Sequence, residues 1–510
     1  AIIEYFFIFR SPLRYEDGYY LQSSIPKKNV EFTLILPAHL KADVRSYNGL
    51  PDAIDTVIKN EERRFTYIFS PEIPGMNDDP LSFYKANLQT VEYVIAYNLA
   101  HGKIRINTID AYAQSVYNIV AQLDKSDISK IYKLGKKIEI SKEMTEEEKI
   151  RKIENYVKEN FYILNINGSG LSEIKSILST KLANTIGLTK LYYHLFEQFG
   201  IENEIVLTCD KIDNKFDKTF DATNFLNDLL FYFPNTQQYL SVDIFAYRLG
   251  LTPSQFTGNN GAFFSKVTVG KTSTFISQIR EIPLLPMQAT TDSIRIQARI
   301  DINGKMLTGA LYRNLRGYTS FGFQANYPYY EIEVKENILE HFIGLGSENT
   351  NISNEKIENA TPEDVWIKPL IMTADISSYE YVKISHDVIV LNIGKLIGKQ
   401  SELKQEETRM LPIEFPFRHL FQRTITIEIP EGYQCKDLAN VNITVYDTDD
   451  ASTAQAGFVS TASQEGNNIV IHCSEYYNRL YYPVSEFTNY QKVNNAAANF
   501  NEKRVTFTKK

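Results

Sequence analysis

Few side chains in this chain could carry out covalent chemistry. The three cysteines are Cys209, Cys435 and Cys473, and none lies in a Cys-x-x-Cys pair, so the sequence predicts neither a zinc ribbon nor a redox motif. Cys435 and Cys473 lie in one late region, where two separate buried thiols are a better interpretation than a disulfide. The seven histidines show no metal-ligand spacing. We expect neither a metal site nor a cofactor.

One cysteine has a histidine in the same region of the chain. Cys209 follows a strand-like run instead of starting a helix, where the helix dipole would lower the pKa of a thiol. His194 falls in the middle of a helical pattern. A buried thiol and a packed imidazole are therefore better interpretations than a catalytic pair.

Two acidic runs raise the question of a cation site. Asp210, Asp213 and Asp217 are close in sequence, and Asp447-Thr448-Asp449-Asp450 resembles part of a calcium loop. The glycine and the closing glutamate of an EF-hand are missing. Both runs are predicted to be solvated turns.

The bulk composition restricts the class of protein. The chain has 510 residues, a net charge of −8 and a pI near 5.6, which argues against a general nucleic-acid binder. Its length suggests about three domains. The 33 tyrosines and 30 phenylalanines favour β structure, because aromatic side chains pack well on pleated, half-buried surfaces. No apolar run is long enough to span a bilayer, so we expect no transmembrane segment.

Residues 1–112 are predicted to form an N-terminal β domain. Turn signals such as Asp17-Gly18 separate short runs that are rich in β-branched and aromatic residues. The pattern indicates strands at Ile2–Phe9, Val30–Leu36, Arg64–Ser70 and Val91–Ala96.

The hydrophobic period becomes helical from residue 113. Thr145 and Glu148 form a capping-box pattern before an amphipathic helix that ends near Asn160. A second amphipathic helix spans Thr185–Phe199 and is ended by Gly200. Three strands are predicted next, at 204–208, 229–233 and 239–243. Residues 113–284 are therefore predicted to form an α+β core with a helical lead-in.

The rest of the chain is predicted to be β structure, divided into domains at 285–375 and 376–510. The clearest hairpin joins Ile294–Ile302 to Lys305–Tyr312 through Asn303-Gly304, which would supply the two positive φ angles of a type I′ turn. Ser347–Asn359 is rich in Asn, Ser and Glu and is predicted to be a solvated loop.

The central block carries a resemblance to a known family. Leu182-Ala183-Asn184-Thr185 opens a helix that Phe199-Gly200-Ile201-Glu202 closes, and the strands beyond Phe225-Leu226-Asn227-Asp228 end at Asp243. This order resembles the transglutaminase-like (papain-like) core. The resemblance implies an α+β multidomain protein in which such a core is flanked by antiparallel β-sandwich domains.

The flanking segments point to a narrower group. Ala1-Ile2-Ile3-Glu4-Tyr5 and Ile429-Pro430-Glu431-Gly432-Tyr433 are similar to a bacterial family of unknown function with an N-terminal β-sandwich domain and C-terminal β domains. The first segment lies inside the first domain of that family, so we expect this chain to begin part-way through the domain. Members are typically exported, which implies a periplasmic or cell-envelope location.

The resemblance also implies where catalytic residues would stand. A transglutaminase-like enzyme needs a thiolate at a helix start, a histidine on the next strand and an aspartate on the third. These positions fall on Thr185, Asp228 and Asp243. No cysteine lies between 180 and 190 and no histidine between 220 and 240, so the triad is degenerate and no catalytic residue is expected. Asn184 or Thr185 is better interpreted as a helix N-cap.

The leading functional hypothesis is therefore a non-catalytic scaffold or binding protein of the bacterial cell envelope. Its ligand would be an unknown protein or glycan, bound in the former active-site cleft near Thr185, Asp228 and Asp243 or on the aromatic-rich β domains. The alternative is an active cysteine-protease or transglutaminase-like hydrolase or acyltransferase with an atypical residue set. A purely architectural envelope protein is a third hypothesis.

Overall fold

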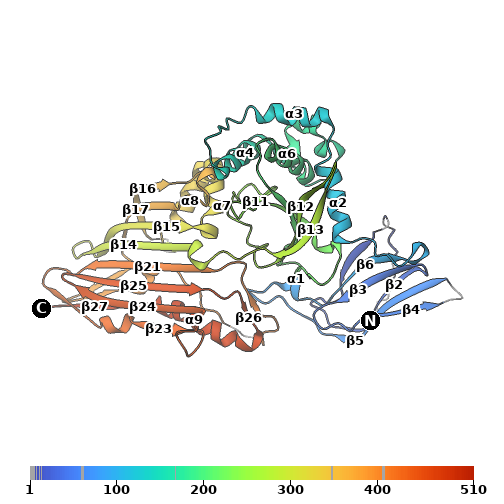
Figure 1. The fold of residues 1–510 in the computed structure, drawn as a ribbon. Helices are drawn as coiled ribbons and strands as arrows, with labels where there is room; N and C mark the ends of the chain where they lie inside the picture. Colours follow the sequence, from blue (N-terminus) through green and yellow to red (C-terminus); the bar gives the residue numbers. More distant parts are fainter. Residues whose placement is uncertain are drawn as a thin grey trace.

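The computed structural model of the protein describes residues 6, 8–10, 12, 14–58, 62–166, 168–345, 349–404 and 408–510. Figure 1 shows a β-rich N-terminal part, a central part in which helices cover a sheet, and a large C-terminal β part. The predicted α+β multidomain fold with antiparallel sheets is confirmed. Within the described ranges, no helix combines the length and the apolar character needed to cross a membrane.

The N-terminal part consists of two small antiparallel sheets and a short helix. The predicted strands 30–36, 64–70 and 91–96 lie inside observed strands and are confirmed. Most of the predicted strand Ile2–Phe9 lies outside the described residues, and its described members Phe6, Ile8 and Phe9 are not in a strand. The sheets are β1-β6-β3 (Glu16–Tyr20, Thr90–Asn98, Leu40–Ser46) and β2-β5-β4 (Lys27–Pro37, Arg63–Ile73, Ile54–Ile58), and the helix is α1 (Tyr84–Asn87).

Helices form one layer of the central part. The predicted capping box is present, because the Thr145 hydroxyl accepts from the backbone N–H of Glu148 and the Glu148 carboxylate accepts from that of Thr145. The helices are α2 (Ile109–Val120), α3 (Lys125–Gly135), α4 (Glu146–Asn160), α5 (Ile174–Thr180) and α6 (Thr185–Gln198). A short parallel pair, β7 (Tyr162–Ile163) with β8 (Leu182–Ala183), precedes α6.

An antiparallel sheet forms the other layer and shares a hydrophobic core with these helices. The predicted strands after α6 are present as β9 (Glu204–Thr208), β10 (Asp228–Phe233) and β11 (Gln238–Ser241), although β11 ends two residues before the predicted end at Asp243. The sheet order is β11-β10-β9-β12-β13, and the last two strands, β12 (Asn260–Val269) and β13 (Thr272–Glu281), are additions that the sequence patterns did not identify.

The C-terminal part is built on one continuous sheet, here called the large sheet. Its order in the described chain is β16-β17-β15-β14-β21-β25-β24-β23 (Asn351–Glu358, Leu370–Ser378, Met306–Arg316, Thr291–Asp301, His419–Glu428, Asn468–Tyr477, Ala456–Glu465, Ile443–Tyr446). The pair β14–β21 is parallel and the others are antiparallel. The predicted boundary at 375/376 therefore crosses one sheet instead of separating two.

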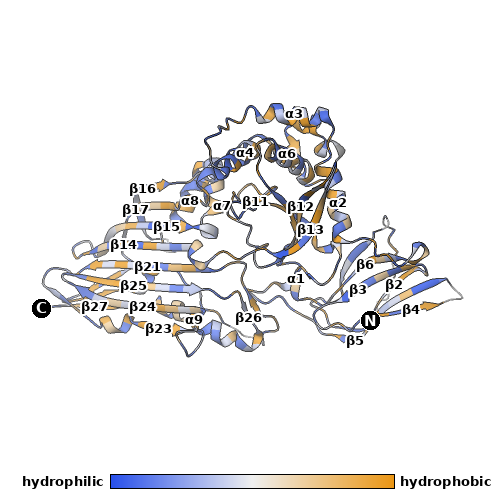
Figure 2. Ribbon diagram, in the orientation of Figure 1, coloured by the Kyte–Doolittle hydropathy of each residue, from blue (hydrophilic) through white to orange (hydrophobic). Residues whose placement is uncertain are grey.

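A smaller sheet and several helices complete this part. Hydrophobic residues of the large sheet, the smaller sheet and α9 (Phe487–Phe500) form a single core. Figure 2 shows hydrophobic and hydrophilic residues interspersed along the strands of the large sheet, as expected when one face is buried and the other is solvated. The remaining elements are α7 (Phe321–Asn326), α8 (Ile332–Ile343), the pair β20–β26 (Ile413–Glu414, Tyr481–Tyr482) and the smaller sheet β18-β19-β27-β22 (Val382–Ser385, Val388–Leu391, Val505–Lys509, Tyr433–Lys436).

Two local predictions in this part were wrong in detail. The hairpin β14–β15 exists, but Asp301 pairs with Met306 and the positive φ of 53° lies at Lys305, so the connection is not a type I′ turn at Asn303-Gly304. Asp301 Oδ1 accepts from the backbone N–H of Gly304, which sets a longer turn. Part of the predicted loop Ser347–Asn359 is the edge strand β16, whose side chains are mostly exposed and therefore polar.

The three parts meet at residues 409–416. Arg409 donates to the carbonyl oxygen of Pro80 at 2.7 Å and to the Ser82 hydroxyl at 2.6 Å. The buried Glu414 carboxylate accepts from the backbone N–H of Phe83 at 3.1 Å, from the Asn87 amide at 2.6 Å and from the Lys215 ammonium at 2.7 Å. One C-terminal segment thus holds both the N-terminal part and the core.

Candidate functional site

The first turn of α6 is fixed by its cap and by close packing. Asn184 is the N-cap, and its side-chain oxygen accepts from the backbone N–H of Gly187 at 2.9 Å. A Cβ at Gly187 would collide with the carbonyl oxygen of Leu171 and with the Ile177 side chain, so this position accommodates only glycine. Of the two residues predicted as the N-cap, Asn184 is the observed one, so the Thr185 side chain is free of that role.

The structure brings Thr185 next to Asp243. The Thr185 hydroxyl donates to Asp243 Oδ2 over a long 3.5 Å, from the first residue of α6 to the loop that follows β11. Burial raises the pKa of Asp243, while a backbone hydrogen bond, the nearby charge of Lys158 and the hydrogen bond from Thr185 oppose that rise. The carboxyl is therefore half-buried and held from several sides.

Asp228 completes the group. It is the first residue of β10, where the backbone N–H of Asn227 donates to the carbonyl oxygen of Thr208 at 3.0 Å. Burial, and next the charge of Asp243, raise the pKa of Asp228 to about 6. Asp243 is thus near enough to Asp228 to affect its ionisation, while a hydrogen bond joins Asp243 to Thr185.

A buried ion pair supports the loop that carries Asp243. The Lys158 ammonium contacts Glu154 at 3.0 Å and donates to the carbonyl oxygens of Ile244, at 3.3 Å, and Tyr247. Glu154 also accepts from the backbone N–H of Leu249 at 3.0 Å. Burial lowers the pKa of Lys158 to about 8, and the Glu154 carboxylate opposes that fall. These contacts fasten residues 244–249 to α4.

A cavity of about 460 Å³ opens beside Asp243. Most of its lining is apolar or aromatic, and part of it comes from the C-terminal region, where Phe245 meets Tyr329 with ring centroids 5.9 Å apart. Figure 1 shows α7 beside the core helices at this place. The lining residues are Val157, Lys158, Glu159, Phe161, Tyr162, Ile163, Leu188, Val242, Asp243, Phe245, Asn326 and Tyr329, which we call the cleft.

The nearest cysteine and histidine are engaged elsewhere. The Cys209 thiol donates to the carbonyl oxygen of Asn214 at 3.0 Å, and burial raises its pKa to about 12. A ring nitrogen of the buried His194 lies 3.1 Å from the carbonyl oxygen of Val120. The site therefore offers one hydroxyl and two carboxyls, and neither a thiolate nor an imidazole.

The acidic run after β9 is a docking segment. Asp213 pairs with Lys85 at 3.1 Å, and Asp217 accepts from the Tyr47 hydroxyl at 3.0 Å, so both carboxylates reach the N-terminal part. In the run near 447, Asp447 accepts from the Tyr482 hydroxyl at 3.1 Å. Among the described residues, no group of His, Cys, Asp and Glu could hold a metal ion. The two acidic runs therefore make contacts within the fold and are only partly exposed to solvent, whereas the sequence predicted solvated turns.

Several residues in or beside the cleft were not predicted from the sequence. Glu154 and Lys158 lie four residues apart and interrupt the apolar face formed by Ile150, Ile153 and Val157, and this charged pair on a buried face was a readable signal. Asn326 and Tyr329 gave no such signal, because they reach the cleft only through the packing of the C-terminal region.

Comparisons with known proteins give a partial match. Residues 388–507 match the model of a domain of unknown function that is known from a solved structure (DUF3858). No curated protein matches the chain. The chain is similar to the crystal structure of a putative protease from Parabacteroides distasonis, with a TM-score of 0.55 and 11% sequence identity over 96% of this chain and 74% of that one. At this identity the similarity concerns the fold alone.

Proposed function

We propose that this protein is a non-catalytic binding protein built on a transglutaminase-like core. The observation that carries the proposal is the chemistry of the three clustered positions, where Thr185, Asp228 and Asp243 stand in place of a thiol, an imidazole and a carboxylate. A threonine hydroxyl needs a strong adjacent base to become a nucleophile. Asp228 and Asp243 are carboxyls that carry no positive charge to stabilise an oxyanion, and burial raises the pKa of both, that of Asp228 to about 6.

The cleft suits a segment of a partner protein. Its walls are largely apolar, which favours an apolar or aromatic side chain. Its polar groups are chiefly acidic, since Asp243 and Glu159 lie at the wall while the Lys158 charge is already compensated by Glu154. We therefore infer that the ligand is a peptide segment that places an apolar side chain beside a basic one.

The alternative is an active hydrolase with an atypical residue set. The contact between Thr185 and Asp243 favours it, because a helix N-terminus and a hydrogen-bonded carboxyl are two parts of an activated nucleophile. Against it stands the missing imidazole. The two functions differ in what happens to a bound peptide.

The experiment is selection of random phage-displayed peptides on the full chain, followed by mass spectrometry of the selected peptides after long incubation. We expect peptides with a basic residue beside an aromatic or aliphatic one, recovered intact. Asp243→Asn should weaken their binding about tenfold, roughly the loss of one charge-assisted contact of 1.4 kcal/mol. Tyr379→Ala, at an exposed tyrosine outside the cleft, is the matched control.

Two outcomes would overturn the proposal. Cleavage or acyl transfer of the selected peptides that disappears in Thr185→Ala would establish the hydrolase alternative. Binding that is equal in Asp243→Asn and the wild type would place the peptide outside the cleft.

We also propose that the protein is exported to the bacterial cell envelope. The support is the similarity of its end segments to an exported bacterial family. Fractionation of the producing cells with a specific antibody tests it, and recovery in the cytoplasmic fraction alone would reject it.

A further inference from the structure

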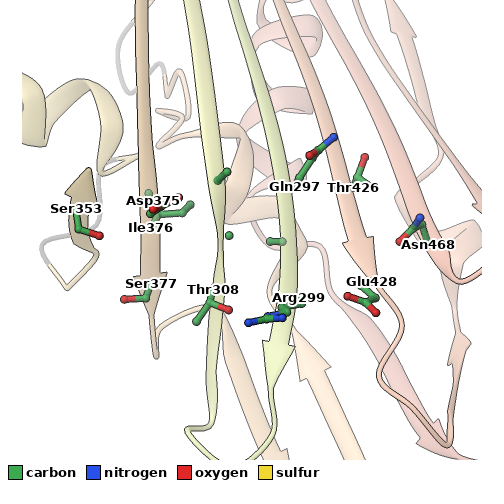
Figure 3. A pocket seen from close by; sticks show the side chains of 13 residues that line it. Gln297, Arg299, Thr308, Ser353, Asp375, Ile376, Ser377, Thr426, Glu428 and Asn468 are labelled. Carbon is green, nitrogen blue, oxygen red and sulfur yellow. The ribbon is translucent and has the colours of Figure 1, made fainter. Parts of the chain in front are cut away.

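The outward face of the large sheet contains a hollow of about 670 Å³, on a different part of the molecule from the cleft. Figure 3 shows its lining side chains distributed over neighbouring strands. They are Gln297, Ala298, Arg299, Thr308, Gly309, Ala310, Ser353, Asp375, Ile376, Ser377, Thr426, Glu428 and Asn468, which we call the sheet-face groove.

Strand register arranges the polar side chains in cross-strand rows. Thr308 pairs with Ser377 and with Arg299, Arg299 pairs with Glu428, and Glu428 pairs with Asn468. Neighbouring strands lie about 4.8 Å apart, so this row presents a polar group at each step across the sheet. A second row two residues away is formed by Asp375, Ala310, Gln297 and Thr426.

The hollow results from the sizes of these side chains. The floor is formed by short side chains of β15, above all Ala310, which is exposed because nothing covers it. Gln297 and Arg299 rise on one side. On the other side β16 is bulged between Ser353 and Lys356, and the Asn354 amide donates to Asp375 Oδ2 at 2.7 Å. The bulge fixes the outer wall.

The wall groups are available for a ligand. Within the described chain, the side chains of Gln297, Arg299 and Glu428 form no hydrogen bond or ion pair, although Arg299 and Glu428 are register partners. A guanidinium, a carboxylate and an amide are planar groups that bind pairs of donors or acceptors. All three side chains are exposed, so their donors and acceptors can reach a ligand in the groove.

The composition of the groove excludes other classes of ligand. Protein interfaces depend on buried aromatic or aliphatic anchors, and the exposed lining of this groove has none. Nucleic acid or another polyanion would need a net positive surface, whereas Arg299 is balanced by Glu428 and Asp375. A ligand rich in neutral hydroxyl groups matches both observations.

The groove is also extended. A second hollow of about 420 Å³ shares Gln297, Ala310 and Asp375 with it and continues along the strands to Tyr312. The guanidinium carbon of Arg295 lies 5.5 Å from the centroid of the Tyr312 ring. Two adjoining hollows fit several linked units better than a single small molecule. We propose that the sheet-face groove binds a chain of neutral sugar residues, as a site independent of the cleft.

Affinity electrophoresis tests this proposal with the full chain in gels that contain galactomannan, xyloglucan, arabinoxylan or soluble starch. We expect at least one of these neutral polysaccharides to retard the wild type. The double variant Gln297→Ala with Arg299→Ala should lose at least about 90% of the retardation, since two wall contacts of about 0.7 kcal/mol each amount to a factor of ten. Ala310→Tyr should abolish it by filling the floor.

Thr461→Ala is the matched control. It changes an exposed residue on β24 of the same sheet and should migrate like the wild type. The proposal is wrong if none of the four polysaccharides retards the protein, or if retardation persists in Ala310→Tyr. Retardation by heparin alone would also reject it, because it would identify a polyanion site.

Discussion

Under the proposed function, Asp228 stands where a transglutaminase-like enzyme would have its imidazole. An imidazole there becomes a cation when it takes a proton from a nucleophile, whereas a carboxyl with a pKa near 6 is largely ionised at pH 7 and brings no positive charge. Its neighbour Asp243 raises the energetic cost of ionising it. At the scale of single residues, this chemistry supports the proposal that the site hydrogen-bonds a ligand.

The ionisation of Asp228 should reduce stability as the pH rises. Its folded pKa of about 6 lies above the value of about 3.9 expected in the unfolded chain, so the folded state binds more protons between pH 4 and 6. Stability is then lost as the pH rises through this window. Asp228→Asn removes the loss and should raise the free energy of unfolding by about 1–2 kcal/mol at pH 8, and by almost nothing at pH 4.

Urea denaturation of both proteins at the two pH values measures this difference. Asp449→Asn, at an exposed aspartate in a turn, should leave the free energy of unfolding unchanged at both. An equal effect of Asp228→Asn at pH 4 and pH 8 would show that Asp228 ionises without penalty.

The residues that the sequence could locate are those tied to element ends. Thr185 and Asp228 begin a helix and a strand, Asp243 lies just after a strand, and the Thr185 hydroxyl lies 3.5 Å from Asp243 Oδ2. Asn326 and Tyr329 could not be located, since no sequence pattern specifies how the C-terminal region packs on the core. A non-local contact becomes visible only when both partners are placed in space.

At the scale of elements, the N-terminus of α6 has a tightly fixed first turn. The cap at Asn184 and the glycine at 187 hold the first turn, and the helix dipole places partial positive charge at Thr185. A helix N-terminus of this kind would lower the pKa of a thiol placed at position 185.

The double variant Thr185→Cys with Asp228→His should therefore restore a reactive thiol. We expect iodoacetamide to alkylate it at pH 6 at least about tenfold faster than the thiol of Thr453→Cys, because a helix N-terminus and an imidazolium stabilise the thiolate. The native cysteines contribute little background, as burial raises the pKa of Cys209 and Cys473 to about 12 and that of Cys435 to about 11. Peptide mapping of the labelled protein gives the rates.

Thr453→Cys is the matched control because Thr453 lies in an exposed turn away from any helix start. Thr185→Cys alone should react at an intermediate rate, with the helix but no imidazolium. Equal rates for the double variant and the control would show that these elements do not form a transglutaminase-like site.

The elements themselves were predicted unevenly, for a physical reason. The capped helices α4 and α6 were located because capping and period 3.6 are local. β16 was missed because an edge strand can expose most of its side chains and still pair through its backbone. The turn at 302–305 was misassigned because the Asp301 side chain, and not the Asn-Gly dipeptide, sets its geometry.

At the scale of the whole molecule, Glu414 connects three regions. Its carboxylate is buried and accepts from Phe83 and Asn87 of the N-terminal part and from Lys215 of the core. A buried carboxylate without its partners, or partners without the carboxylate, is costly. The relative arrangement of the parts therefore depends on this side chain more than on any exposed contact.

Glu414→Ala should uncouple the N-terminal part. We expect a loss of about 3 kcal/mol of unfolding free energy and a separate, lower-temperature transition in calorimetry, because the Phe83 N–H and the Asn87 amide lose their acceptor. Glu414→Gln should recover part of the loss by keeping one acceptor oxygen. Glu431→Ala, at an exposed glutamate, serves as the control, and a single unchanged transition in Glu414→Ala would contradict the expectation.

The parallel pair β14–β21 has a consequence for synthesis on the ribosome. β14 ends at Asp301 and its parallel partner β21 begins at His419. Roughly 120 further residues must therefore be translated before β21 can pair with β14, which takes about 6–24 s at ordinary rates of translation. During that interval the nascent half-sheet has an open edge that can pair with another chain. β14 is central in the folded protein but is an unprotected edge strand during synthesis. We therefore expect the yield in cells to be limited by chaperone capacity more than by the stability of the final fold.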